Sequence, residues 1–255
     1  NKRKRIYSQH KNILQSGAAL GTGYNVERSS DLLAAIMMQN GSIMLDEGGS
    51  AAFNKRPPNL NSEFPPGLDA VRFYTEFASP SKETYTWNAA QPNSLEAFAT
   101  GKTAMFFGYA FHSAQIRALA PKLNFDVSPL PQIEGNPAAN VANYWLLTAS
   151  KKSSHPDAAW DFIQFATRAD QVEPYLAVTG KPTALRSLIK KQLDIPTAAP
   201  FASQVLTARN WYRGADIAGA ELALNGLIND ILNDKFDQPE KALELAAQKV
   251  NQTIR

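Results

Sequence analysis

Three consecutive residues, Gly101, Lys102 and Thr103, have the types that close a phosphate-binding loop. Such a loop needs another glycine five residues before Gly101, but that position holds Glu96, whose carboxylate would repel phosphate. A helical pattern also precedes the segment and a strand-like pattern follows it, which reverses the strand–loop–helix order of nucleotide sites. We therefore interpret Gly101 as the stop of a helix and Lys102 as a solvent-exposed side chain.

Other residue types that could perform catalysis form no recognisable group. The chain has no cysteine, which excludes disulfides, thiolate catalysis and cysteine-type zinc sites, and it has no Gly-x-Ser-x-Gly motif. Its histidines lack partners at helical spacing: His10, His112 and His155. Most carboxylates fall on predicted solvent faces, among them Asp157, Asp161, Glu221, Glu240 and Glu244. We predict no catalytic residue, metal site or cofactor, although a pair of glycosidase carboxylates stays an open alternative.

Aromatic side chains next to loops are the remaining candidates for ligand contact. Phe106 and Phe107 are interpreted as core residues, whereas Tyr109, Trp145 and Trp211 fit a core position or a ligand contact equally well. A flat ring with a polar edge suits a sugar, because the C–H face of the sugar packs on the ring while its hydroxyls form hydrogen bonds.

These candidates must be positioned by a mixture of helices and strands, so the predicted class is α/β. Apolar residues at helical spacing and terminal Pro or Gly residues predict helices near 29–41, 66–79, 93–100, 111–119, 153–166, 169–180, 217–231 and 239–254. In the helix after Pro156, we expect Trp160, Ile163 and Ala166 on the inner face. Strands are predicted near 103–109, 123–130 and 140–148.

Composition limits the class of protein further. The formal net charge is +3 in 255 residues, without a continuous basic stripe, so nucleic-acid binding is not expected. No apolar run has the length of a membrane span. The chain begins with Asn1 and a basic run instead of an initiator methionine and a signal segment, and this indicates the interior of a longer precursor.

An ordered set of motifs resembles the extracellular solute-binding proteins of the maltose-binding type, which are the capture subunits of ABC importers. The motifs are FATGKTAM (98–105) followed by GY (108–109), FDVSPLP (125–131), SKKSSHPDAAWDF (150–162) and GKPTAL (180–185). The resemblance extends from about Gly17 to Ile254. It implies the periplasmic-binding-protein-like fold, in which two α/β lobes enclose the ligand in a cleft.

By this resemblance, residues 1–147 and 197–255 form the C-terminal lobe, and residues 148–196 return to the N-terminal lobe. The opening strands and helices of the N-terminal lobe have no counterpart in this sequence. We therefore expect a two-lobe fold truncated at its N-terminus, with apolar residues of the returning segment, such as Trp160 and Phe162, left uncovered.

The resemblance also suggests which residues contact the ligand. They are Tyr109 and Phe111 by motif position, Tyr144 and Trp145 on the following strand, Trp211 and Arg213 in a loop, and Tyr24 and Asn25 near the first crossover. The implied function is capture of a small solute, a sugar or oligosaccharide, for ABC permease subunits at the membrane. The implied location is extracellular or periplasmic, with any lipid anchor outside this chain. A sugar-acting hydrolase, or a sensor or surface protein that presents its ligand, stays as the alternative.

Overall fold

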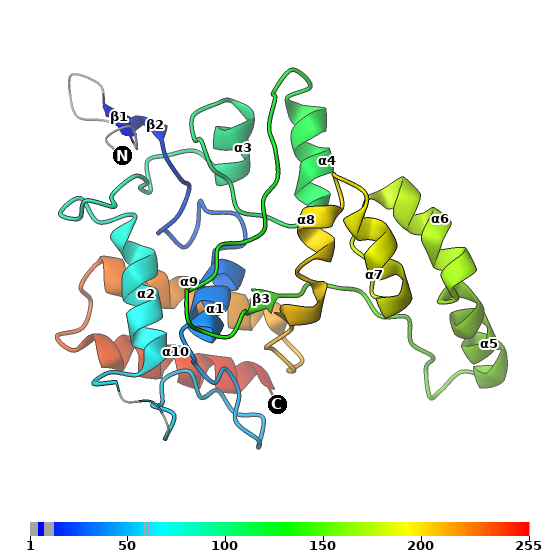
Figure 1. The fold of residues 1–255 in the computed structure, drawn as a ribbon. Helices are drawn as coiled ribbons and strands as arrows, with labels where there is room; N and C mark the ends of the chain where they lie inside the picture. Colours follow the sequence, from blue (N-terminus) through cyan, green and yellow to red (C-terminus); the bar gives the residue numbers. More distant parts are fainter. Residues whose placement is uncertain (1–4, 8–12, 59, 61, 255) are drawn as a thin grey trace.

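The computed structural model describes residues 5–7, 13–58, 60 and 62–254, and helices form most of its regular structure (Figure 1). The α-helices are α1 (Ser29–Gln39), α2 (Pro66–Glu76), α3 (Ser94–Ala99), α4 (Ala110–Leu119), α5 (Pro156–Ala166), α6 (Ala169–Thr179), α7 (Arg186–Leu193), α8 (Ala199–Ala202), α9 (Ile217–Leu232) and α10 (Pro239–Ile254). A 3-10 helix, η1, covers Val205–Thr207. The strands are β1 (Arg5–Tyr7), β2 (Ile13–Ser16), β3 (Asn140–Val141) and β4 (Ala208–Arg209).

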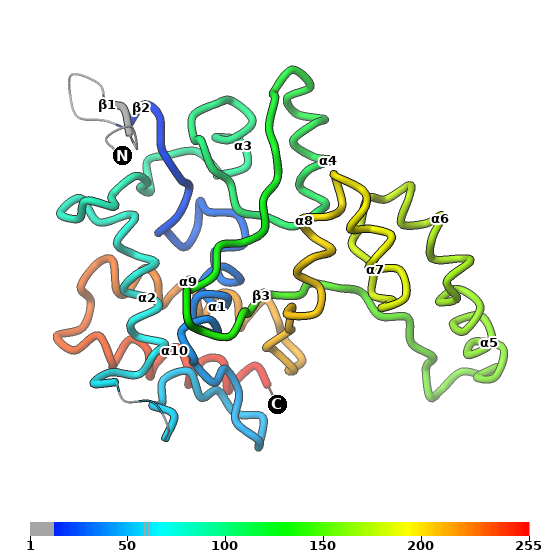
Figure 2. The backbone as a smooth tube through the Cα atoms, in the orientation of Figure 1, coloured from blue at the N-terminus to red at the C-terminus, as the bar shows by residue number. Residues whose placement is uncertain are grey.

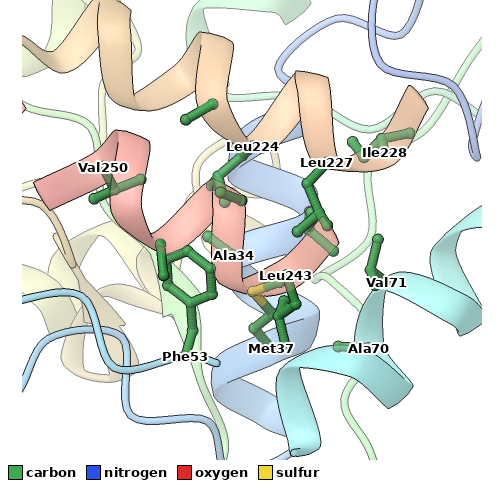
Figure 3. Close-up of a cluster of buried hydrophobic side chains, with 14 of the residues drawn as sticks. Ala34, Met37, Phe53, Ala70, Val71, Leu224, Leu227, Ile228, Leu243 and Val250 are labelled. Carbon is green, nitrogen blue, oxygen red and sulfur yellow. The ribbon is translucent and has the colours of Figure 1, made fainter. Parts of the chain in front are cut away.

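The main hydrophobic core lies where α1, α2, α9 and α10 pack together (Figure 3). On α9, Leu224, Leu227 and Ile228 recur at helical spacing, and each is at most 1% exposed. They meet Met37 of α1 and Leu243 of α10, which are buried to the same degree. Full burial of each such side chain contributes about 1.5–3 kcal/mol, so this four-helix contact holds α1 and α9 in fixed relation.

Every helix predicted from the sequence is present, and its ends agree within a few residues. The prediction for Gly101 is confirmed, because α3 ends at Ala99 and Gly101 then adopts a left-handed φ of 73° with nothing near its missing side chain. Asn93 caps α3, since its side-chain oxygen accepts a hydrogen bond from Leu95 N at 2.9 Å.

The strand predictions are wrong for most of their residues. Between 103 and 109 only Thr103 forms a β-bridge, to Ser16, and the segment 123–130 contains no strand. In the third segment, strand geometry is limited to Asn140 and Val141. A strand requires a neighbour for its backbone hydrogen bonds, and no described strand lies beside the rest of these segments.

The parallel pair β3–β4 marks where the chain leaves the core and returns to it (Figure 2). Asn140 pairs with Ala208 and Val141 with Arg209. The 66 residues between them, 142–207, include helices α5 to α8, which extend away from the α1–α2–α9–α10 core (Figure 1). We call residues 142–207 the excursion; it begins and ends at adjacent points, because β3 and β4 are paired.

The far end of the excursion exposes large apolar side chains. Helix α5 has no buried residue, and Trp160 and Phe162 are 50% and 62% exposed. The expectation that these two residues are uncovered is confirmed, whereas the inner face predicted for Trp160, Ile163 and Ala166 is not buried. The physical reason is that α5 packs on α6, and no described element covers the other faces of α5.

Candidate functional site

The site is built at the start of α1, where a loop is held tightly against α9. A side chain at Gly23 would place its Cβ only 2.8 Å from the carbonyl oxygen of Asn225, so the loop can approach α9 only with glycine there. The hydroxyl of Ser29 lies 2.7 Å from Gly23 O and 2.8 Å from Asn225 Oδ1. These contacts place Arg28, the residue immediately before Ser29, beside the first turns of α9.

Arg28 links α1 to α9 through two ion pairs. Its Nη2 lies 2.7 Å from Asp31 Oδ2 and 2.6 Å from Glu221 Oε1, and its Nε donates to Asp31 Oδ2 at 2.8 Å. Burial would lower the pKa of Arg28, but the two carboxylates outweigh it, so the pKa is raised and the guanidinium stays charged. Arg28 has a left-handed backbone, with a φ of 56°, which is uncommon for a residue other than glycine.

Tyr109 joins this network from the start of α4. Its hydroxyl donates to Asp31 Oδ2 at 2.6 Å, and its ring lies 6.0 Å from the guanidinium of Arg28. Burial and the neighbouring charge of Asp31 raise the pKa of Tyr109 well above its ordinary value, although Arg28 opposes the change. Tyr109 therefore stays protonated and keeps its hydrogen bond to Asp31.

Gly108 and His112 position Tyr109. The backbone N–H of Tyr109 donates to His112 Nδ1 at 2.8 Å, and His112 is 2% exposed. A Cβ on Gly108 would lie 2.5 Å from the ring of Phe106 and 2.7 Å from His112 Nδ1, so only glycine fits there. Burial lowers the pKa of His112, which keeps the ring neutral and able to accept this hydrogen bond.

A hollow of about 90 Å³ opens beside the ion pairs. Its wall combines the charged residues Arg28, Asp31 and Glu221 with the aromatic residues Tyr144 and Trp211. Further polar and apolar residues complete the lining: Ser30, Val141, Ala142, Asn143, Asn210, Tyr212 and Ile217. Charged groups therefore stand next to aromatic rings at the point where β3 and β4 connect the excursion to the core. We call this hollow the Arg28 pocket.

The structure brings together part of the predicted contact set. Tyr144 and Trp211 line the Arg28 pocket, and Tyr109 reaches its charged wall through Asp31. Phe111 stacks on Tyr109, with ring centroids 5.9 Å apart. The predictions for Tyr109, Phe111, Tyr144 and Trp211 as ligand contacts stay predictions with this added support.

The other four predicted residues lie outside the lining of this pocket. Trp145 and Tyr24 are 93% and 70% exposed, and Arg213 is exposed as well. Asn25 uses its amide within the fold, because Nδ2 donates to Asn88 O and Gln91 O while Oδ1 accepts from Trp87 Nε1. These residues also stay predictions, and Asn25 has an evident structural role in fixing the loop before Arg28.

Sequence reasoning missed the charged part of the site. The placement of Glu221 on a solvent face was wrong, because its side chain is 28% exposed and pairs with Arg28, 193 residues away. The one local signal was the i, i+3 spacing of Arg28 and Asp31. His10 lies outside the described residues, and within them no three His, Asp or Glu side chains are arranged to hold a metal ion.

A second hollow, of about 150 Å³, lies at the other end of α9. Arg72, Asp230, Asp234 and Phe236 belong to its lining, and none of the predicted contact residues does. This hollow is larger, and it also combines an aromatic ring, Phe236, with a paired carboxylate, Asp230. We place the candidate site at the Arg28 pocket because only that lining includes predicted contact residues, Tyr144 and Trp211.

The amino-acid sequence matches the bacterial extracellular solute-binding protein family over residues 6–173. The chain belongs to this family, as the motifs had indicated. A search of curated proteins found no match. Among the described residues, no helix is both long and apolar enough to cross a membrane.

Solved structures that resemble the chain include solute-binding proteins with a bound sugar. An ABC transporter solute-binding protein from Thermotoga lettingae, bound with α-D-tagatose, is 21% identical with a TM-score of 0.69, and the match covers 100% of this chain and 61% of that one. A maltose/maltodextrin-binding domain from Bdellovibrio bacteriovorus, bound to maltotriose, is 15% identical with a TM-score of 0.67, covering 100% of this chain and 64% of that one. A cyclic α-maltosyl-1,6-maltose binding protein from Arthrobacter globiformis is 21% identical with a TM-score of 0.67, covering 93% and 59%.

At these identities, the likeness establishes the fold and not the ligand. The predicted fold class, α/β and periplasmic-binding-protein-like, is confirmed. The chain spans about three-fifths of the length of these relatives.

Proposed function

We propose that this protein binds a small carbohydrate at the Arg28 pocket and delivers it to an ABC-type importer. The observation that carries the proposal is the meeting of Trp211 and Tyr144 with the Arg28–Asp31–Glu221 network in one hollow. A sugar needs both features, because its C–H face is apolar and its hydroxyl groups require hydrogen-bond partners. The sugar ligands of structurally similar proteins support this choice.

The lobe arrangement belongs to the same proposal. We infer that residues 1–147 and 197–255 form one lobe and that residues 148–196 belong to the other. Support comes from the excursion that leaves at β3 and returns at β4, and from the exposed apolar side chains at its far end, such as Trp160 and Phe162. The Arg28 pocket lies beside the two connecting strands, where a ligand can contact both lobes and favour the closed arrangement.

The partners follow from this role. The ligand is a sugar or oligosaccharide, the membrane partners are the permease subunits of an ABC importer, and the protein acts outside the cytoplasmic membrane, in a periplasmic or extracellular location. Membership of an extracellular solute-binding family supports this location.

The first experiment is a thermal-shift screen of the protein with neutral mono- and oligosaccharides, amino acids, peptides and polyamines. The proposal expects at least one sugar to raise the melting temperature in a concentration-dependent way. Each stabilising sugar is then incubated with the protein and analysed by chromatography. Stabilisation only by other solutes would contradict the carbohydrate assignment, and conversion of the sugar would favour the hydrolase instead.

Substitutions then locate the binding site. Loss of a stacked ring removes roughly 1.5–3 kcal/mol, so Trp211→Ala should weaken binding at least about tenfold by calorimetry. We expect a loss of similar size for Tyr109→Ala, because it removes the hydroxyl that holds Asp31 in the pocket wall. Phe73→Ala is the matched control, because Phe73 is a 50% exposed aromatic residue on α2 outside the pocket lining. Melting temperatures of all variants are measured without ligand, because Trp211 also packs against the core. Unchanged affinity in both the Tyr109→Ala and Trp211→Ala variants would contradict the assignment of the site.

A further inference from the structure

The charges around the Arg28 pocket do not cancel. Its lining contains one cation, Arg28, and two carboxylates, Asp31 and Glu221, which gives a formal charge of −1. The remaining lining residues are neutral. The nearby Arg213 is exposed and is not part of the lining.

The single cation, Arg28, is already paired with two carboxylates of the protein. Nη2 of Arg28 contacts both carboxylates, and Nε donates to Asp31 Oδ2. Among the described residues, Nη1 of Arg28 has no hydrogen-bond or ion-pair partner, but an anionic ligand bound there would lie beside two carboxylates that together outweigh the single positive charge.

The carboxylates favour a ligand that donates hydrogen bonds. Asp31 Oδ2 already accepts from Arg28 and Tyr109, and Glu221 Oε1 accepts from Arg28. In the part of the chain that the structure describes, neither Asp31 Oδ1 nor Glu221 Oε2 has a side-chain or ion-pair partner. An ionised carboxylate oxygen can only accept hydrogen bonds, so it suits a hydroxyl or ammonium group and repels a second carboxylate or phosphate.

We propose that the Arg28 pocket selects sugars without negative charge, neutral or amino sugars, and rejects the corresponding sugar acids and sugar phosphates. This inference rests on the proposed carbohydrate function and adds the charge class of the ligand. One uncompensated charge at roughly 6 Å in a partly solvated site changes affinity by about tenfold or more. A uronic acid should therefore bind at least about tenfold more weakly than the neutral sugar of the same configuration.

The first arm of the test measures the charge of the pocket without any sugar. The chain has four tryptophans; Trp145→Phe and Trp160→Phe remove the two exposed ones, and Trp87 is fully buried. Fluorescence quenching in this background therefore reports on Trp211, which lines the pocket. The quenching constant of each ion is divided by its quenching constant for free indole. At equal ionic strength, this corrected constant should be larger for caesium than for iodide. Glu221→Gln should reduce this preference, whereas Glu76→Gln, at an exposed ion pair on α2, should leave it unchanged.

The second arm measures ligand selection at pH 7 and fixed salt. Glucose, galactose and mannose are each titrated as the neutral sugar, the uronic acid and the 2-amino sugar, with saturation-transfer NMR as the readout. The neutral and amino forms of at least one sugar should bind, and its uronic acid should bind at least about tenfold more weakly. Glu221→Gln should reduce this difference in affinity between the neutral sugar and the acid.

The possible failures are distinguishable. Equal binding of the acid and the neutral form, or stronger quenching by iodide than by caesium, would overturn the charge selection while leaving carbohydrate binding intact. If no sugar binds in any form while caesium remains the stronger quencher, the proposed carbohydrate function fails and the charge preference of the pocket is supported.

Discussion

The ion pair between Arg28 and Glu221 connects the start of α1 to α9, and its strength can be measured by a double-mutant cycle. The perturbations are Arg28→Gln, Glu221→Gln and the two together. The nitrogen and oxygen atoms are 2.6 Å apart, and the side chains are 24% and 28% exposed. Exposed ion pairs contribute about 0.2–1 kcal/mol, whereas breaking a fully buried pair costs about 3–5 kcal/mol. For this partly buried geometry we expect a coupling free energy of about 1–2 kcal/mol.

The assay is urea unfolding at pH 7, followed by far-ultraviolet circular dichroism at low and high salt. The control is the same cycle on Lys82 and Glu76, whose atoms are 2.9 Å apart but whose side chains are 52% and 34% exposed. That pair should show a coupling below about 1 kcal/mol that decreases further with salt. A coupling free energy for Arg28 and Glu221 no larger than that of the control pair would refute the claim that this ion pair holds α1 against α9 in the pocket wall.

Three further predictions concern the core and the support of Tyr109. Leu224→Ala should reduce the free energy of unfolding by about 2–5 kcal/mol, whereas Leu222→Ala, on the same helix but 61% exposed, should change it by less than about 0.5 kcal/mol in urea titrations. Because burial lowers the pKa of His112, the unfolded chain binds more protons, so stability should decrease as the pH falls below about 6.5; His112→Gln should flatten this part of the pH profile. Gly108→Ala should destabilise the protein by at least about 1 kcal/mol, whereas Gly226→Ala, in open space on α9, should stabilise it by up to about 1 kcal/mol; melting curves that ranked the two variants in reverse would contradict the close packing around Tyr109.

Most helices could be predicted from the sequence because their causes are local, whereas α7 and α8 were not predicted. On α9, Leu224, Leu227 and Ile228 follow helical spacing, and this same spacing places them in the core. Gly101 likewise carries its own signal, since a left-handed residue after a helix is usually glycine. These features depend only on neighbours along the chain.

Strands and the charged site depend on residues far away in the sequence. The segments 123–130 and 140–148 have strand-like composition, but composition does not supply the neighbouring strand that would pair with them. Glu221 has the pattern of a solvent-exposed residue on α9, and only the folded loop around Gly23 brings Arg28 to it. The resemblance to the family led to Tyr109, by its motif, and to Trp211, by its place in a loop, whereas the ion pairs beside them required the three-dimensional structure.

The aromatic wall of the Arg28 pocket offers the most direct test of the central claim, that a carbohydrate binds there. The measurement is a fluorescence titration of the Trp145→Phe, Trp160→Phe background with the most stabilising sugar from the thermal-shift screen. We predict a saturable change in Trp211 emission with the same dissociation constant as calorimetry, and at least about tenfold weaker binding when Tyr109→Ala is added. Calorimetric binding of the sugar without any change in Trp211 emission would contradict the claim, because the ligand would then lie elsewhere.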